Sequence, residues 1–90
     1  MSGRRRNVWV RRAFAKSLRA RRKEARLSQE ALGRRARLTG KFIGEVERGE
    51  KSVSLDSLTL IAKALGIGVV ALVEPADVGR RTTSRKKVRG

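Results

Sequence analysis

Three hydroxyl-bearing residues each stand directly before a short stretch in which apolar residues recur at helical spacing. They are Ser28, Thr39 and Ser54. A serine or threonine at this place accepts a hydrogen bond from a backbone N–H of the first helical turn, and it therefore marks where a helix begins. Two of the three stretches are followed by glycine, Gly49 and Gly66, where a left-handed residue is expected to end a helix. The pattern restricts the middle of the chain to short helices joined by tight turns.

Two further helices are expected outside these three. After Asn7, a potential cap, apolar residues recur every four positions and predict a helix over about residues 8–26. Near the other end, an apolar stretch at residues 69–73 predicts a last short helix, which Pro75 closes. No stretch carries a strand pattern, and a chain of 90 residues has room for a single core. We therefore expect an all-α domain of five short helices.

The charge of the chain lies mainly at its two ends. The chain has 24 lysines and arginines against 8 acidic residues, a formal net charge of +16. Residues 1–26 hold 11 basic residues and 1 acidic residue and residues 79–90 hold 6 and none, whereas residues 27–78 hold 7 of each. Blocks of like charge repel one another, resist packing and commonly bind phosphate. We expect three parts: a basic N-terminal arm at 1–7, a helical domain at 8–77 and a basic, disordered tail at 78–90.

Several classes of site are excluded by residue types that the chain lacks. It has no cysteine and no histidine, which excludes disulfides, zinc fingers, cysteine nucleophiles and any mechanism that needs an imidazole. Its carboxylates are scattered, and no glycine-rich phosphate loop follows a strand. The longest apolar run, residues 67–73, is far shorter than the roughly 20 residues of a membrane-spanning helix. We expect a cytoplasmic, nucleoid-associated protein that is not an enzyme, binds no cofactor or metal and does not enter a membrane.

The residues around the caps follow a known pattern. It consists of the stretches LSQE at 27–30, VERG at 46–49, SLDSL at 54–58 and IAKALG at 61–66. In these stretches, and across about residues 14–73, the chain resembles the five-helix DNA-binding domain of the Cro/CI phage-repressor family, also called the XRE family. The resemblance implies a compact lambda-repressor-like fold whose second and third helices form a helix-turn-helix, flanked here by the basic arms. In such a unit the third helix enters the major groove of duplex DNA.

The resemblance also implies roles for individual residues. On the third helix, base readout falls to Thr39, Gly40, Lys41, Phe42 and Glu45. Contacts to the DNA backbone fall to Ser28, Gln29, Arg34, Arg37, Arg48 and Lys51, and the arm adds Arg4, Arg5 and Arg6. Arg22 and Glu47 match a pair that the family commonly uses as an internal salt bridge between the first and third helices. Glu47 is therefore expected to be structural, although it lies on the helix that reads DNA.

Four of these residues have a second interpretation. Gln29 contacts a phosphate or is simply a good helix former at the surface. Lys41 donates hydrogen bonds either to guanine O6 and N7 or to a phosphate. Glu45 either accepts a hydrogen bond from cytosine N4 or disfavours binding to incorrect sequences. Phe42 presses on a thymine methyl group or packs in the core beside Ile43. We favour phosphate contact for Gln29 and DNA contact for Phe42.

The chain departs from the family pattern at several positions. Gly40 and Gly44 lie inside the third helix, where each costs about 0.5–1 kcal/mol relative to alanine. They leave fewer side chains to contact bases directly, while they permit close approach to the duplex. Arg37 stands where the family often has glycine, so either the turn closes differently or Arg37 is strained. Arg21 replaces an apolar residue of the first helix, with its stem over the core and its head in water or on phosphate.

The last expected helix, at residues 69–73, also departs from the family pattern. It is apolar on all sides, where the family usually has polar, exposed positions. Such a helix either enlarges the core or forms an interface. We favour an interface, a homodimer contact through Val69, Val70 and Val73, because dimers suit two-fold operators.

The leading interpretation is a sequence-specific transcriptional regulator that binds a two-fold operator in double-stranded DNA. It is a repressor or an autoregulator, associated with a prophage or a restriction–modification system. One alternative is an antitoxin or adaptor that grips a protein partner through residues 69–73. Another is a nucleoid protein whose basic arms bind DNA with little sequence preference.

Overall fold

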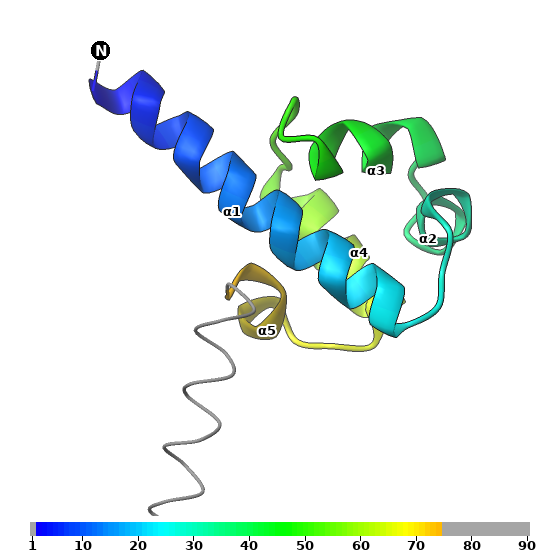
Figure 1. The fold of residues 1–90 in the computed structure, drawn as a ribbon. Helices are drawn as coiled ribbons and strands as arrows, with labels where there is room; N and C mark the ends of the chain where they lie inside the picture. Colours follow the sequence, from blue (N-terminus) through cyan, green and yellow to red (C-terminus); the bar gives the residue numbers. More distant parts are fainter. Residues whose placement is uncertain (1, 75–90) are drawn as a thin grey trace, which may run out of the picture.

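The computed structural model describes residues 2–74 of the chain, and Figure 1 shows the fold. This part contains five α-helices and no strand. They are α1 (Ser2–Glu24), α2 (Gln29–Arg35), α3 (Gly40–Glu47), α4 (Leu55–Leu65) and α5 (Val69–Val73). None of these helices is long and apolar enough to cross a membrane. The expected all-α domain of five helices is confirmed.

The three hydroxyl caps lie where the sequence places them. Ser28, Thr39 and Ser54 have extended backbone, and each side-chain oxygen accepts a hydrogen bond from the backbone N–H three residues later, at 2.9, 3.0 and 3.0 Å. Each bond satisfies one of the N–H groups that the first turn of a helix leaves without an intrahelical partner. The starts of α2, α3 and α4 are therefore fixed by local chemistry.

The first helix begins earlier than expected. Asn7 is not its cap, because α1 starts at Ser2 and continues through Asn7 to Glu24. Arginine, which fills positions 4–6, is a good helix former, and no proline in this stretch stops the helix. Residues 2–7 are thus continuous with α1, whose N-terminal end projects beyond the other helices in Figure 1. The expected tail at 78–90 and Pro75 lie outside the described residues.

Four helices are followed by a residue with left-handed backbone. These residues are Arg26 (φ 59°), Arg37 (φ 60°), Gly49 (φ 76°) and Gly66 (φ 73°). After each one, the next amide donates to a carbonyl oxygen five residues earlier, at 2.7–3.2 Å, which closes the helix end. Gly49 and Gly66 confirm the expected stops. The turn after α2 closes in the ordinary way, so Arg37 itself adopts the left-handed conformation that favours glycine.

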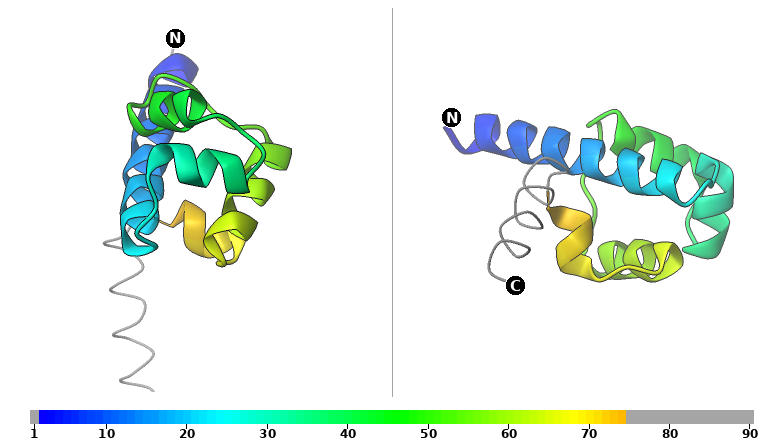
Figure 2. Two further views of the ribbon diagram at one scale, coloured as in Figure 1. Left: turned by 90° about the vertical axis from the view of Figure 1, so that its right-hand side faces the viewer. Right: turned by 60° about the horizontal axis from the view of Figure 1, so that its bottom comes forward.

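Each helix contributes a fully buried side chain to one core. These are, from α1 to α5 in order, Leu18, Leu32, Ile43, Ile61 and Leu72. Helix α1 packs against α3 and α5, and α2 packs against α3 and α4, which encloses the core (Figure 2). The arrangement leaves Ser28, at the start of α2, and Lys41, on α3, exposed at the surface.

Candidate nucleic-acid interface

The backbones of α2 and α3 lie in contact at two glycines. A Cβ atom at Gly33 would lie 2.7 Å from the carbonyl carbon of Thr39, and one at Gly40 would lie 2.6 Å from Glu30 Cγ and 2.9 Å from Glu30 Cα. Neither position has room for a side chain, so the two glycines set the spacing of the helices. A Cβ atom at Gly40 would point toward α2, so close packing of the helices is one reason for this glycine. Its assignment to base readout and close approach stays a prediction.

The outer face of α3 carries two charged side chains. Lys41 is exposed and Glu45 is half-buried, and their four-residue spacing puts them on the same side of the helix. Thr39, which caps α3, is also exposed. Phe42 is half-buried and packs against the core, as its second interpretation has it. Thr39, Lys41 and Glu45 are thus the base-readout candidates whose side chains are available to a duplex.

An ion pair joins α1 to α3. Arg22 Nε donates to Glu47 Oε2 at 2.6 Å, and Nη2 donates to Oε1 at 3.0 Å. The side chains are only 12% and 3% exposed, and Arg22 Nη1 also donates to the carbonyl oxygen of Leu27 at 2.7 Å. The hydrogen bond to Glu47 raises the pKa of Arg22, against the opposing effect of burial. The pair implied by the family resemblance is therefore present as a contact between helices, and it fixes the C-terminal end of α3.

Gln29, the first residue of α2, joins this ion pair. Its Nε2 donates to Glu47 Oε1 at 3.1 Å. A Cβ atom at Gly44 would lie 3.2 Å from Gln29 Oε1 and 3.2 Å from Arg48 Nη1, so the glycine makes room for both side chains. The bond between Gln29 and Glu47 is not predicted from the sequence, where Gly44 inside α3 is the one feature related to it. The amide group expected at a phosphate is thus oriented by Glu47.

Arg48 and Glu50 form a second ion pair, directly after α3. The distance between Arg48 Nε and Glu50 Oε2 is 2.9 Å, and both side chains are exposed. The hydrogen bond between them raises the pKa of Arg48 and lowers the pKa of Glu50. An exposed pair of this kind contributes little to stability. Arg48 can therefore exchange the carboxylate for another anion at small cost.

The remaining candidates for backbone contacts are spread over several elements. Ser28, before α2, and Lys51, after α3, are exposed, and so is Arg34 on α2. Arg37 is also exposed, but it lines a groove with residues of α4 and belongs to a different surface from the outer face of α3. The arm side chains, which lie outside the described part, are those of Arg4, Arg5 and Arg6.

One exposed arginine near α3 is not distinguished by the sequence. Arg12 Cγ lies 3.6 Å from the position of a Cβ atom at Gly49, which puts this α1 residue beside the C-terminal end of α3. In the sequence Arg12 is one of many basic residues at 1–26. Only the packing of α1 across α3 distinguishes it from the others.

Polar contacts tie α5 to α1. The hydroxyl group of the buried Ser17 donates to the carbonyl oxygen of Leu72 at 2.6 Å and lies 2.9 Å from that of Glu74. Arg21 Nη2 donates to the carbonyl oxygen of Ala71 at 3.4 Å. One nitrogen of the Arg21 head therefore contacts α5, and the bond from Ser17 is not predicted from the sequence.

Apolar side chains cover the outer side of α5 and the neighbouring part of α1. Val69, Val70 and Val73 are 38%, 69% and 43% exposed, and Trp9 on α1 is 69% exposed. Trp9 and Val73 both line an apolar groove of about 370 Å³, with Phe14 also in its wall. Exposed apolar patches are common where a protein binds another protein, a membrane or a ligand.

Comparison with known proteins places the helices in a family. The family model HTH_3, described as helix-turn-helix, matches residues 18–72. Control protein C.BamHI of Bacillus amyloliquefaciens is 36% identical over 56 residues, which cover 62% of this chain and 69% of that protein. The immunity repressor protein of Bacillus phage phi105 is 39% identical over 56 residues, which cover 62% of this chain and 39% of that protein.

A solved structure shares the arrangement of helices. The restriction-modification controller protein C.AhdI of Aeromonas hydrophila superposes with a TM-score of 0.71 at 35% identity, over 72% of this chain and 94% of that chain. The family match runs from within α1 into α5 and so includes the whole α2–α3 unit. The chain belongs to the HTH_3 family of helix-turn-helix proteins.

Proposed function

We propose that this protein is a transcriptional regulator that binds a two-fold operator in double-stranded DNA with α3 in the major groove. The observation that carries the proposal is the way α3 is held. The glycine contact fixes α3 to α2, and Glu47 fixes it to α1. The face with Lys41 and Glu45 is left for the duplex. A helix held from two sides presents its outer side chains in one orientation, as base readout requires.

The relatives support this proposal and suggest the kind of regulator. They are named as a control protein, a phage immunity repressor and a restriction-modification controller protein. We infer that this chain is a repressor or autoregulator of a restriction–modification system or a prophage. Binding to DNA would place it at the nucleoid in the cytoplasm.

In the proposed complex, base contacts and backbone contacts come from different elements. Thr39, Lys41 and Glu45 face base edges, with Lys41 on guanine and Glu45 on cytosine. Ser28 and Gln29 meet a phosphate beside the start of α2, where Glu47 orients the amide group. Further backbone contacts are proposed for Arg34, Arg48 and Lys51 and, in the basic arm, for Arg4, Arg5 and Arg6.

The proposed dimer uses the exposed side of α5. Val69, Val70 and Val73 are at the surface although they are apolar, and a second copy would remove them from water. An isologous contact of this kind relates two copies of α3 by a two-fold axis, which matches a two-fold operator.

The experiment that tests the function is a binding measurement on the duplex upstream of the protein's own gene. A scrambled duplex of the same composition serves as control, at about 0.15 M salt, where binding by charge alone is weak. We expect the upstream duplex to bind two chains and to bind roughly a thousandfold tighter than the control. Equal affinity for the two duplexes would instead support the alternative of a nucleoid protein that binds DNA with little sequence preference.

The apolar groove favours one other function. An antitoxin or adaptor would use the same α5 surface, next to Trp9 and Val73, to hold a different protein. Such a protein would require its co-expressed partner for stability, whereas the proposed regulator is a stable homodimer when purified alone.

A further inference from the structure

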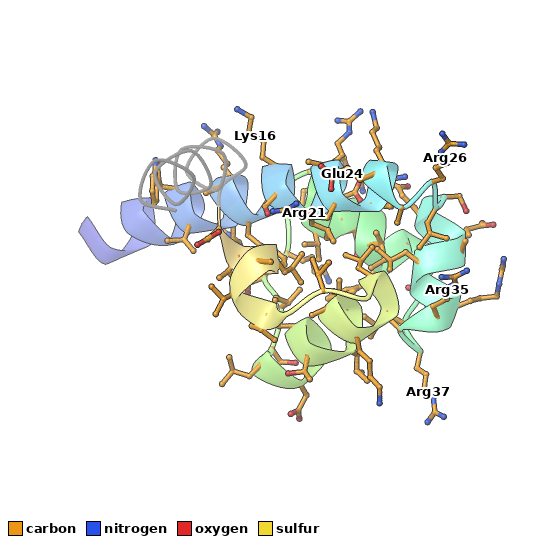
Figure 3. All side chains as sticks on the ribbon, turned by 90° about the horizontal axis from the view of Figure 1, so that it is seen from below. Lys16, Arg21, Glu24, Arg26, Arg35 and Arg37 are labelled. Carbon is orange, nitrogen blue, oxygen red and sulfur yellow. The ribbon has the colours of Figure 1, made fainter. Side chains whose placement is uncertain are left out.

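A second groove lies between the C-terminal parts of α2 and α4. It has a volume of about 590 Å³ and is lined by Arg35, Arg37, Leu60, Lys63 and Ala64. We call it the cationic groove, because all the charged residues among these five are basic. In Figure 3, Arg35 and Arg37 lie at the α2 end of the molecule, and Arg37 extends away from the helical body. The lining residues come from α2, the turn after it and α4, and they do not include residues of α3.

Arg37 occupies its place in the groove in spite of an unfavourable backbone. Its φ of 60° is left-handed, a conformation that glycine adopts freely and arginine does not. The turn is closed by the bond from the Leu38 amide to the Gly33 carbonyl oxygen, at 2.7 Å. The turn therefore holds Arg37 where its side chain adds a third cation to the groove.

The floor of the groove is apolar. Leu60 is 37% exposed, and Lys63 and Ala64 follow it by three and four positions, so all three share one side of α4. Cations around an exposed leucine match a ligand that carries carboxylates beside apolar side chains. A DNA backbone offers the negative charge but no apolar group for Leu60.

We propose that the cationic groove binds an acidic, amphipathic peptide segment of a partner protein. Charge complementarity selects the acidic residues of the segment, and Leu60 selects its apolar residues. Because the groove and the outer face of α3 are built from different residues, the two surfaces can be occupied at the same time. The proposal does not depend on the operator or on the dimer.

The test uses the full chain and a fluorescently labelled synthetic peptide in which glutamate and leucine alternate. Binding is measured by fluorescence anisotropy for the unmodified chain, Arg37→Gly and Arg26→Gly. The two variants are matched, because each removes one positive charge and each relieves a left-handed arginine in the turn that follows a helix. Arg26 does not line the groove. We expect the melting temperature to rise in both variants.

Only Arg37→Gly is expected to weaken peptide binding strongly, by about tenfold, since it alone loses a charge-assisted contact. Arg26→Gly should lose no more than about twofold, through the lower net charge. Equal peptide affinities of the two variants would overturn the proposal, because they would show that charge alone holds the peptide.

A second matched pair tests the apolar part of the proposal. Leu60→Gln removes the floor of the groove, whereas Leu55→Gln changes a residue of the same helix that is 80% exposed and lies outside the groove. We expect Leu60→Gln to weaken peptide binding and Leu55→Gln to leave it unchanged. If Leu60→Gln has no effect and a short DNA duplex displaces the peptide from the groove, the site is a phosphate site and the proposal is wrong.

Discussion

Glu47 lies on the helix proposed to read DNA, yet it points into the protein. It accepts hydrogen bonds from both Arg22 and Gln29 and is only 3% exposed. A carboxylate that has left water needs such partners to compensate the lost hydration. Its role is therefore to hold α3 against α1 and to orient Gln29, while base recognition falls to its neighbours.

Replacing Glu47 by alanine leaves the guanidinium group of Arg22 partly buried without its partner. We expect the free energy of unfolding to fall by about 3 kcal/mol, as is typical when one half of a buried pair is removed. Urea unfolding followed by circular dichroism measures the change. Glu50→Gln is the control, because it breaks only the exposed pair with Arg48 and should leave the midpoint almost unchanged. A similar loss in both variants would contradict the distinction between the two pairs.

Lys41 and Arg48 are expected to affect DNA binding in different ways. Lys41→Ala should change the preferred base at one position of each half-site, by about 1–3 kcal/mol of discrimination. Arg48→Ala should weaken binding to all duplexes alike and reduce the dependence of affinity on salt by about one phosphate contact. Titrations of both variants with a panel of duplexes at several salt concentrations measure these effects. An unchanged base preference in Lys41→Ala would assign Lys41 to a phosphate.

At the level of helices, the boundaries that depend on one local residue are the ones that the sequence predicts correctly. Ser28, Thr39 and Ser54 act through one local hydrogen bond each, so the sequence predicts them correctly. Asn7 fails as a cap because good helix formers continue on both of its sides. The left-handed backbone of Arg26 is not predicted at all, since tertiary packing decides where a chain without glycine must turn.

The candidate site shows the same division between local and long-range information. Its helices, its caps and the exposed Lys41 follow from the sequence and the family resemblance. The direction of Gly40 and the bond between Gln29 and Glu47 do not, because both depend on how closely α2 approaches α3. The reason for a glycine inside a helix cannot be decided from the sequence. The missing side chain makes room equally for a DNA duplex or for a neighbouring helix.

The two glycines of α3 should respond to alanine in opposite ways. Gly40→Ala places a Cβ atom 2.9 Å from the Cα atom of Glu30, so α2 and α3 must move apart, at an expected cost of about 1–3 kcal/mol. Gly44→Ala meets only the ends of two side chains, which can move, and gains up to about 1 kcal/mol in helix propensity. Thermal unfolding of both variants tests the contrast. It is refuted if Gly44→Ala is the more destabilised of the two.

At the scale of the whole molecule, different elements carry different surfaces. The outer face of α3 is proposed for DNA, the valines of α5 for a second copy and the cationic groove of α2 and α4 for an acidic partner. The basic residues of α1 extend the positive charge past the end of α3, where Arg12 lies beside Gly49. The three proposed surfaces therefore use different side chains of one small domain.

The dimer contact is tested by a charge on α5. Val70→Glu alters a side chain that is 69% exposed, so the fold should persist while the dissociation constant of the dimer rises by roughly tenfold or more. Analytical ultracentrifugation measures the mass, and fluorescence of Trp9, the single tryptophan, reports on the adjoining groove. Leu55→Glu is the control on an exposed leucine of α4. Unaltered dimerisation in Val70→Glu would exclude α5 as the interface.

The central claim, that α3 reads a two-fold sequence, is tested most directly by selection from random duplex DNA at about 0.15 M salt. The selection is carried out with the unmodified chain and with a Lys41→Ala, Glu45→Ala double variant. We expect the unmodified chain to enrich a two-fold symmetric motif with half-sites about one helical turn apart, and the double variant to lose discrimination within each half-site. Strong retention of DNA without any enriched motif would contradict the claim and assign binding to the basic arms.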